Sequence, residues 1–147
     1  MKKLPKLLVV DDEIDICNFV KSFFEMRGFK VSIALNGDEA MEKLAKEAPD
    51  VVIMDIRLPD GNGVAACREI REERPETKVI MLTSYADDEA VFNSIVAGAS
   101  GYLLKQIRGQ ELLRAIETVA GGQSLLDPAV THKVLEKMKR LASGHQP

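Results

Sequence analysis

Four short apolar runs, each followed at once by polar residues, constrain this 147-residue chain more than any other feature. The runs cover residues 7–10, 51–54, 79–82 and 102–104 and are rich in Val, Ile and Leu. The segments between them carry apolar residues at helical spacing and are bounded by glycine or proline. This alternation predicts an α/β fold in which the runs are buried parallel strands. In such sheets, ligands bind in the crevice at the carboxyl ends of the strands.

The polar residues that follow the runs are expected to meet at that edge of the sheet. They are Asp11, Asp12, Glu13, Asp55, Thr83 and Lys105. Crowded carboxylates raise one another's pKa unless a cation lies among them, and Mg²⁺ prefers oxygen ligands of this kind. A phosphoryl-transfer switch is the leading hypothesis for such a site. Asp11 and Asp12 also fit the acidic start of a helix, a role compatible with metal binding.

Glycines, prolines and capping residues complete five strand and helix alternations. We expect helices over residues 13–27, 37–48, 64–73, 87–97 and 109–120. A strand through residues 31–35 alternates in polarity, and residues 59–63 form a turn after the third strand. Within the fourth helix, apolar residues lie on more than one side, and we interpret one side as a partner or dimer face. They are Val91, Phe92, Ile95 and Val96.

The C-terminal part of the chain lies outside this alternation. Gly121 and Gly122 end the fifth helix, and Asp127 followed by Pro128 is a strong helix start. A sixth, amphipathic helix to about Leu141 is predicted, with its lysines on a solvated face. The predicted division is a domain over residues 4–120 and a linker with a C-terminal helix over residues 121–147.

Composition excludes several other classes of protein. A net charge of −3 and a pI near 5.5 disfavour a nucleic-acid surface within these residues. Cys17 and Cys67 lack the spacing of a zinc site or a redox pair. The basic residues 1–6 precede too short an apolar run for a signal peptide or a membrane span. We therefore expect a cytoplasmic protein with no membrane partner.

Four motifs in order carry a family resemblance over residues 4–120. They are L-L-V-V-D-D-E, V-I-M-D-I-R-L-P-D-G-N-G, M-L-T-S and G-Y-L-L-K. Together they resemble the receiver domain of bacterial two-component response regulators. The stretches L-P-D-G-N-G, A-G-A-S-G-Y-L-L-K and G-G-Q-S-L-L-D-P are most similar to receivers of LuxR-type (NarL/FixJ-like) DNA-binding regulators. The resemblance implies a flavodoxin-like doubly wound five-stranded sheet of order 2-1-3-4-5 with five helices, to which the C-terminal helix is an addition.

The resemblance also implies chemical roles for the residues at the site. Asp55 is the expected phosphoacceptor, a carboxylate nucleophile that becomes an aspartyl phosphate. Mg²⁺ is the expected cofactor, bound directly by Asp12, Asp55 and the backbone carbonyl of Arg57, with Asp11 acting largely through water. Thr83 and Lys105 are expected to bind the phosphoryl oxygens.

Further residues are implied in switching and in partner contacts. Thr83 and Tyr102 would form the switch and bias a surface made by the fourth helix, fifth strand and fifth helix. Arg57 and Tyr85 would modulate the rate of dephosphorylation, and Ile14 is a candidate contact for the kinase. Expected partners are a sensor histidine kinase and, on activation, a second copy of the chain. DNA would be reached only through an output domain absent from this chain. Transcriptional regulation is the expected output.

The chain departs from the family's pattern at one position, and its residues also bear on three alternative classes of protein. Gln106 stands where many receivers have a cis proline, so a trans bond is expected after Lys105. A phosphohydrolase of the haloacid dehalogenase type would need a second aspartate where Arg57 stands, and a flavodoxin's phosphate would be repelled by residues 11–13. A phosphorylation-independent interaction module usually lacks one or more of the site residues. A signalling switch that catalyses only its own phosphorylation and dephosphorylation, and not an enzyme, is therefore predicted.

Overall fold

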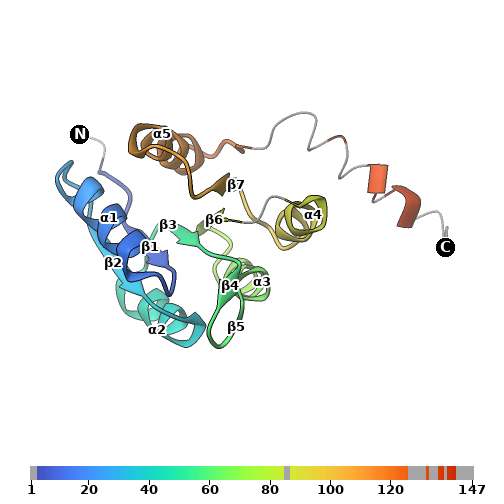
Figure 1. Ribbon diagram of the computed structural model, residues 1–147, viewed down its shortest axis with the longest axis horizontal. Helices are drawn as coiled ribbons and strands as arrows, with labels where there is room; N and C mark the ends of the chain where they lie inside the picture. Colours follow the sequence, from blue (N-terminus) through green and yellow to red (C-terminus); the bar gives the residue numbers. More distant parts are fainter. Residues whose placement is uncertain (1–2, 85–86, 126–131, 133–135, 138, 142–147) are drawn as a thin grey trace.

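A five-stranded parallel sheet forms the centre of the molecule (Figure 1). The computed structural model describes residues 3–84, 87–125, 132, 136–137 and 139–141. The strands of the sheet are β1 (Leu7–Val10), β2 (Val31–Ala34), β3 (Val51–Met54), β6 (Lys78–Thr83) and β7 (Gly101–Leu104). Their spatial order is β2-β1-β3-β6-β7, with every neighbouring pair parallel. Numbered as the main strands only, this is the predicted order 2-1-3-4-5, which is confirmed.

Five helices connect the strands and cover both faces of the sheet. They are α1 (Ile14–Glu25), α2 (Gly37–Glu47), α3 (Gly63–Glu73), α4 (Asp88–Val96) and α5 (Gly109–Ala120). Helices α1 and α5 lie on one face, and α2, α3 and α4 lie on the other (Figure 1). The five helices predicted between residues 13 and 120 are therefore confirmed, with ends that differ by at most two residues.

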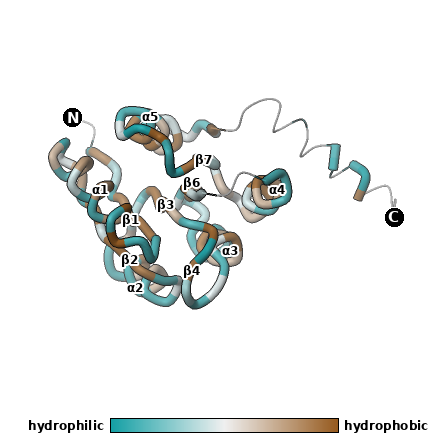
Figure 2. Tube along the Cα trace, in the orientation of Figure 1, coloured by the Kyte–Doolittle hydropathy of each residue, from teal (hydrophilic) through white to brown (hydrophobic). Residues whose placement is uncertain are grey.

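Two hydrophobic cores lie on the two sides of the sheet because the central strands are buried on both faces. All four residues of β1 and of β3 are buried, and Figure 2 shows hydrophobic residues gathered on these strands. Alternate residues of each strand join opposite cores: Leu7 and Val9 face α1 and α5, whereas Leu8 and Val10 face α2 and α3. Continuous apolar runs are the pattern expected of strands covered on both sides.

The predicted second strand is shorter in the structure than in the sequence pattern. It ends at Ala34, and Leu35 lies outside it with 37% of its surface exposed. The reason is the start of α2. The backbone N–H of Leu35 donates to Glu39 Oε2 at 2.6 Å, and the backbone N–H of Glu39 donates to the Asn36 side chain at 2.8 Å. These two hydrogen bonds at the start of α2 take Leu35 away from the sheet.

The predicted turn after the third strand contains a small hairpin that sequence reasoning missed. Strands β4 (Arg57–Leu58) and β5 (Gly61–Asn62) pair antiparallel, and α3 follows directly at Gly63. The hairpin lies at the carboxyl end of β3, beside the start of α2 (Figure 1). Its two residue pairs are too few to produce a visible alternation in the sequence.

After α5 the chain returns to the amino end of β7. The backbone N–H of Leu125 donates to the Ser100 carbonyl at 2.9 Å, and the Ser124 hydroxyl donates to the same oxygen at 3.3 Å. The Leu125 side chain lies so close to Gly101 that a Cβ there would be only 3.0 Å from Leu125 Cδ1.

The predicted sixth helix lies largely outside the described residues, although residues 132, 136–137 and 139–141 are helical. No helix in the described part of the chain is long and apolar enough to span a membrane.

Candidate functional site

The carboxyl ends of β1 and β3 bring three aspartates together. Asp11 and Asp12 follow β1, and Asp55 follows β3, the strand paired with it. Each of these three residues offers one carboxylate oxygen, and the three oxygens lie within 4.8 Å of one another. Asp11 and Asp55 are buried, with 2% and 6% of their surfaces exposed, whereas Asp12 is exposed. Burial of two carboxylates side by side needs compensating positive charge.

Lys105 supplies that charge from the end of β7. Its Nζ lies 2.9 Å from Asp11 Oδ2, 2.9 Å from Glu13 Oε1 and 3.2 Å from Asp55 Oδ2. The Lys105 backbone is fixed as well, because its N–H donates to the Thr83 carbonyl at 2.9 Å. One ammonium group therefore contacts three carboxylates from two different segments of the chain.

The pKa values reflect this competition between burial and pairing. Burial raises the pKa of Asp11, and the charge of Asp55 adds to the effect, while Lys105 and the Glu13 N–H oppose it. For Lys105, burial alone would lower the pKa, but its hydrogen bonds to Asp11 and Glu13 and the nearby carboxylate charges outweigh burial and raise it. The lysine consequently stays charged at neutral pH.

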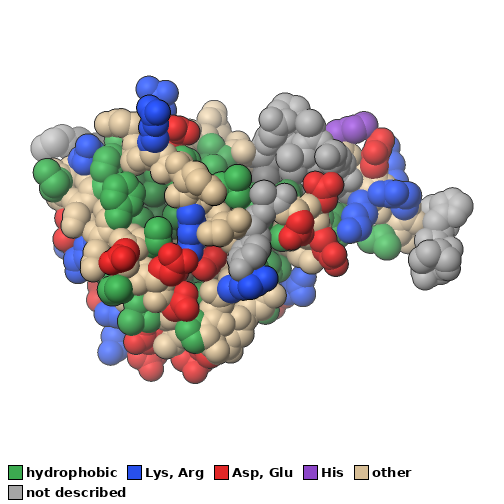
Figure 3. Space-filling view, viewed as in Figure 1, with side chains coloured by type: hydrophobic (Ala, Val, Ile, Leu, Met, Phe, Trp, Pro, Cys, Tyr) green, Lys and Arg blue, Asp and Glu red, His purple; other side chains and the backbone are tan. Residues whose placement is uncertain are grey.

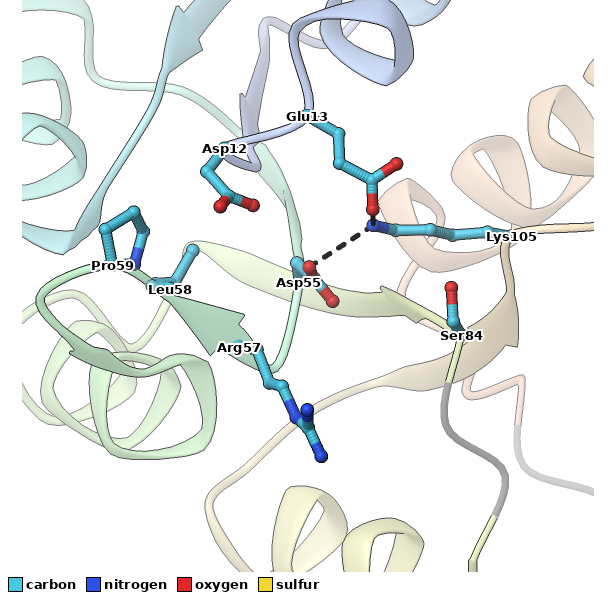
Figure 4. Close-up of a pocket in the computed structure, with 8 residues that line it drawn as sticks. All are labelled: Asp12, Glu13, Asp55, Arg57, Leu58, Pro59, Ser84 and Lys105. Carbon is cyan, nitrogen blue, oxygen red and sulfur yellow. Dashed lines mark hydrogen bonds and ion pairs between the residues drawn. The ribbon is translucent and has the colours of Figure 1, made fainter.

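The carboxylates open into a cavity of about 230 Å³ (Figure 4). Its lining consists of Asp12, Glu13, Asp55, Arg57, Leu58, Pro59, Ser84 and Lys105. In Figure 4 the Asp55 carboxylate lies between the Lys105 ammonium on one side and the hairpin residues on the other. Figure 3 shows acidic side chains gathered on this face of the molecule, with basic side chains beside them. A small anion in this cavity would lie beside Asp12, Asp55 and Lys105.

The donor set in this cavity fits Mg²⁺. Oxygen ligands from carboxylates, with room left for water, match the preference of this ion for hard ligands and for keeping part of its hydration. Asp11, Asp12 and Asp55 offer such oxygens within one small volume. Arg57 lines the same cavity.

The two predicted switch residues differ in their surroundings. Thr83 is the last residue of β6 and is fully buried, and Tyr102 in the middle of β7 is partly buried against the core that α2 and α3 cover. Burial raises the pKa of Tyr102 to about 12, and the charges of Asp87 and Asp55 add to the shift. The Tyr102 hydroxyl is therefore neutral at physiological pH.

Other predicted residues are placed as follows. Arg57 is exposed and its side chain points away from Asp55 in Figure 4. Ile14 is the first residue of α1 and is 50% exposed, next to Glu13. Tyr85 lies outside the described residues. The peptide bond after Lys105 is trans, as expected for Gln106.

Sequence reasoning named Glu13 but gave it no role, and it missed the importance of Gly63. Glu13 contacts the Lys105 ammonium, and the only signal in the sequence is that it follows two aspartates. Gly63 packs against the phosphoacceptor candidate so closely that a Cβ would lie 1.9 Å from the Asp55 carbonyl oxygen. Only glycine allows this approach, which brings the start of α3 against the backbone of the site.

The fold and this cluster of residues define a class of protein. Residues 7–117 match the family described as response regulator receiver domain, and the chain belongs to that family. It is thus a signalling receiver and not an enzyme, as the sequence predicted.

The chain is similar to several known transcriptional regulators. It is 43% identical over 109 residues to the DNA-binding transcriptional activator DevR/DosR of Mycobacterium tuberculosis, a match that covers 74% of this chain and 50% of that protein. It is 36% identical over 137 residues to the transcriptional regulatory protein LnrK of Bacillus subtilis, covering 92% and 62%. The crystal structure of a LuxR-family two-component response regulator from Aurantimonas matches with a TM-score of 0.80 at 28% identity, covering 92% of this chain and 99% of that one. The chain spans about half to two thirds of the length of these two curated relatives.

Proposed function

We propose that Asp55 accepts a phosphoryl group from a sensor histidine kinase, in a reaction that needs Mg²⁺. An Asp55 carboxylate oxygen attacks the phosphorus, a P–O bond to Asp55 forms, and the P–N bond of the phosphohistidine breaks, with imidazole as the leaving group. With a small acyl phosphate, the bond that breaks is instead a P–O bond and the leaving group is a carboxylate. The product in both cases is an aspartyl phosphate.

The neighbouring residues supply the electrostatics of this step. Asp12, Asp55 and the Arg57 carbonyl would bind the cation directly and Asp11 largely through water; when bound, Mg²⁺ neutralises the charge that builds up on the phosphoryl oxygens. The Lys105 ammonium would move from the carboxylates to pair with a phosphoryl oxygen. The Thr83 hydroxyl would donate a hydrogen bond to another phosphoryl oxygen. The observation that carries the proposal is that the Lys105 ammonium lies 3.2 Å from Asp55 in a cavity that also holds Asp12.

Phosphorylation would then change the surface of α4, β7 and α5. Thr83 drawn toward the phosphoryl group would leave space for the ring of Tyr102, and this movement would bias α4 between two positions. Arg57 and Tyr85 would set the rate of hydrolysis by limiting access of water, and Ile14 would contact the kinase. The relatives named above are transcriptional regulators, which supports a cytoplasmic receiver that controls dimerisation and a DNA-binding output domain.

The test is intact mass after incubation with acetyl phosphate and Mg²⁺. We expect one phosphoryl adduct on the unaltered chain and none on Asp55→Asn. Asp50→Asn is the matched control, because Asp50 lies at the opposite end of the same strand and its carboxylate accepts from the Lys6 N–H at 2.8 Å. It should be phosphorylated like the unaltered chain.

Size-exclusion elution before and after beryllofluoride would test the surface change. An earlier elution that Asp55→Asn does not show would support activation by self-association. A folded chain that binds Mg²⁺ but gains no adduct would instead support a phosphorylation-independent interaction module.

A further inference from the structure

The β4–β5 hairpin carries the backbone of Arg57 at the site, yet it has little structure of its own. Only two residue pairs form its ladder, Arg57 with Asn62 and Leu58 with Gly61, joined through Pro59 and Asp60. A two-stranded ladder of this size is marginal in water. Contacts with the rest of the molecule must therefore hold the Arg57 peptide in place.

The base of the hairpin is fixed to the backbone around Asp55. The Gly63 N–H donates to the Ile56 carbonyl at 2.6 Å, and Gly63 packs against the Asp55 carbonyl. Asn62 caps α3 by accepting from the Val64 N–H at 2.7 Å. Leu58 adds an apolar anchor, because it is buried in the core beneath α2 and α3.

The tip of the hairpin is fixed to a different helix by one side chain. The Asp60 carboxylate accepts from the N–H of Gly37 at 2.8 Å through Oδ1 and from the N–H of Asp38 at 2.9 Å through Oδ2. These are the first two amides of α2, which have no partner within the helix. Asn36 satisfies the third amide, that of Glu39. Hydrogen bonds from Gly37 and then Asp38 hold the pKa of Asp60 below its usual range, so the carboxylate is ionised at neutral pH.

We propose that Asp60 is a positioning residue for the cation, acting through the Arg57 carbonyl. Arg57 lies between the fixed base and the fixed tip, three residues from Asp60 along the chain. A side-chain ligand can adjust by rotation, but a backbone carbonyl moves only with its peptide. Without Asp60 the hairpin is fixed mainly at its base, and the Arg57 peptide gains freedom that binding of the ion must then remove. The inference rests on the proposed function, since it assumes that the Arg57 carbonyl is a ligand.

Two variants separate this role from a general effect on α2. Asp60→Ala and Asn36→Ala each remove acceptors from the amides at the start of the same helix, but only Asp60→Ala releases the hairpin. Mg²⁺ affinity is measured for the full chain by titration followed through backbone amide chemical shifts, and the melting temperature is measured without Mg²⁺. We expect both variants to melt at lower temperature. Asp60→Ala should weaken Mg²⁺ binding about tenfold, as is found for residues that orient metal ligands, and Asn36→Ala should leave it unchanged.

Asp60→Asn provides a second test that preserves the shape of the side chain. It keeps one acceptor oxygen but presents an amide group to the other backbone N–H, so an intermediate loss of Mg²⁺ affinity is expected. An unchanged affinity in Asp60→Ala, or an equal loss in Asn36→Ala, would overturn the positioning role while leaving the proposed function intact. Absence of Mg²⁺ binding by the unaltered chain would overturn both.

Discussion

Helices α4 and α5 both follow strands that end at the site, but they are held in opposite ways. Helix α5 buries four apolar residues, which are Leu112, Ala115, Ile116 and Val119. Helix α4 buries Ser94 alone along its described length, and Val96 is 49% exposed. Conversely, α4 has a side-chain cap, with Asp87 accepting from the Ala90 N–H at 2.7 Å, whereas α5 has none. Burial fixes α5, and α4 relies more on its ends.

This difference predicts which of the two helices shifts more readily. Segments with little buried apolar surface open and shift at lower free energy than well-packed ones. Helix α4 is such a segment and follows the buried Thr83, whereas α5 packs firmly against the sheet and α1.

The largest effect is expected from truncating the core side of α5. Ile116 is fully buried, so Ile116→Ala should lower the free energy of unfolding by about 2 to 5 kcal/mol. Ile95→Ala in α4 is the matched control and should cost less than half as much, because Ile95 is only partly buried. Urea denaturation followed by circular dichroism measures both. Equal losses would mean that the two helices are held alike.

A smaller effect is expected in the reactivity of the two buried cysteines. Cys67 lies on the buried face of α3, with its Sγ 3.8 Å from the Ala97 carbonyl at the end of α4. Cys17 lies on the buried face of α1, with its Sγ 3.3 Å from the Asp11 carbonyl. If α4 opens more readily than α1, Cys67 should react with iodoacetamide about tenfold faster than Cys17, a difference of about 1.4 kcal/mol in opening free energy. Mass spectrometry of the labelled peptides gives the two rates. Cys17 reacting first would contradict the comparison.

The pH of this labelling experiment follows from the pKa values of the thiols. Burial raises the pKa of both Cys17 and Cys67 from 9.0 to about 11. The folded state therefore favours the protonated thiols. Their contribution to the free energy of unfolding is fully present below pH 9.0 and is lost as the pH rises through about 11. Labelling below pH 9.0 reports local opening of an otherwise stable protein.

The smallest effect is expected at the one buried residue of α4. The Ser94 hydroxyl donates to the Ala90 carbonyl at 2.8 Å. Both residues belong to α4, so this hydrogen bond does not connect the helix to another element. Ser94→Ala should change the free energy of unfolding by no more than about 0.5 kcal/mol, since alanine favours helix and little packing is lost. A loss of several times that amount in urea denaturation would show that Ser94 anchors the helix to the sheet.

The sequence predicted the sheet well because each central strand is a continuous apolar run covered on both faces. The features that the sequence did not predict depend on contacts between segments far apart in the chain. The Asp60 carboxylate reaches the start of α2, and nothing in the turn sequence distinguishes it from an ordinary turn aspartate. For α4 the sequence indicated apolar residues on more than one side, but it did not show that Phe92 and Ile95 would both be only partly buried.

For the site itself, the sequence identified the residues but not their pairing. Asp11, Asp55 and Lys105 were expected at one edge because parallel strands end together. That a single ammonium contacts three carboxylates, one of them Glu13, depends on side-chain conformations that no spacing specifies.

The chain returns from α5 to the amino end of β7, where the backbone N–H of Leu125 donates to the Ser100 carbonyl. Lys105 stands just past the carboxyl end of the same strand. Leu125 is therefore attached at the edge of the sheet opposite Asp55. A change in β7 that starts at the phosphorylation site would have to extend along the whole strand to reach Leu125.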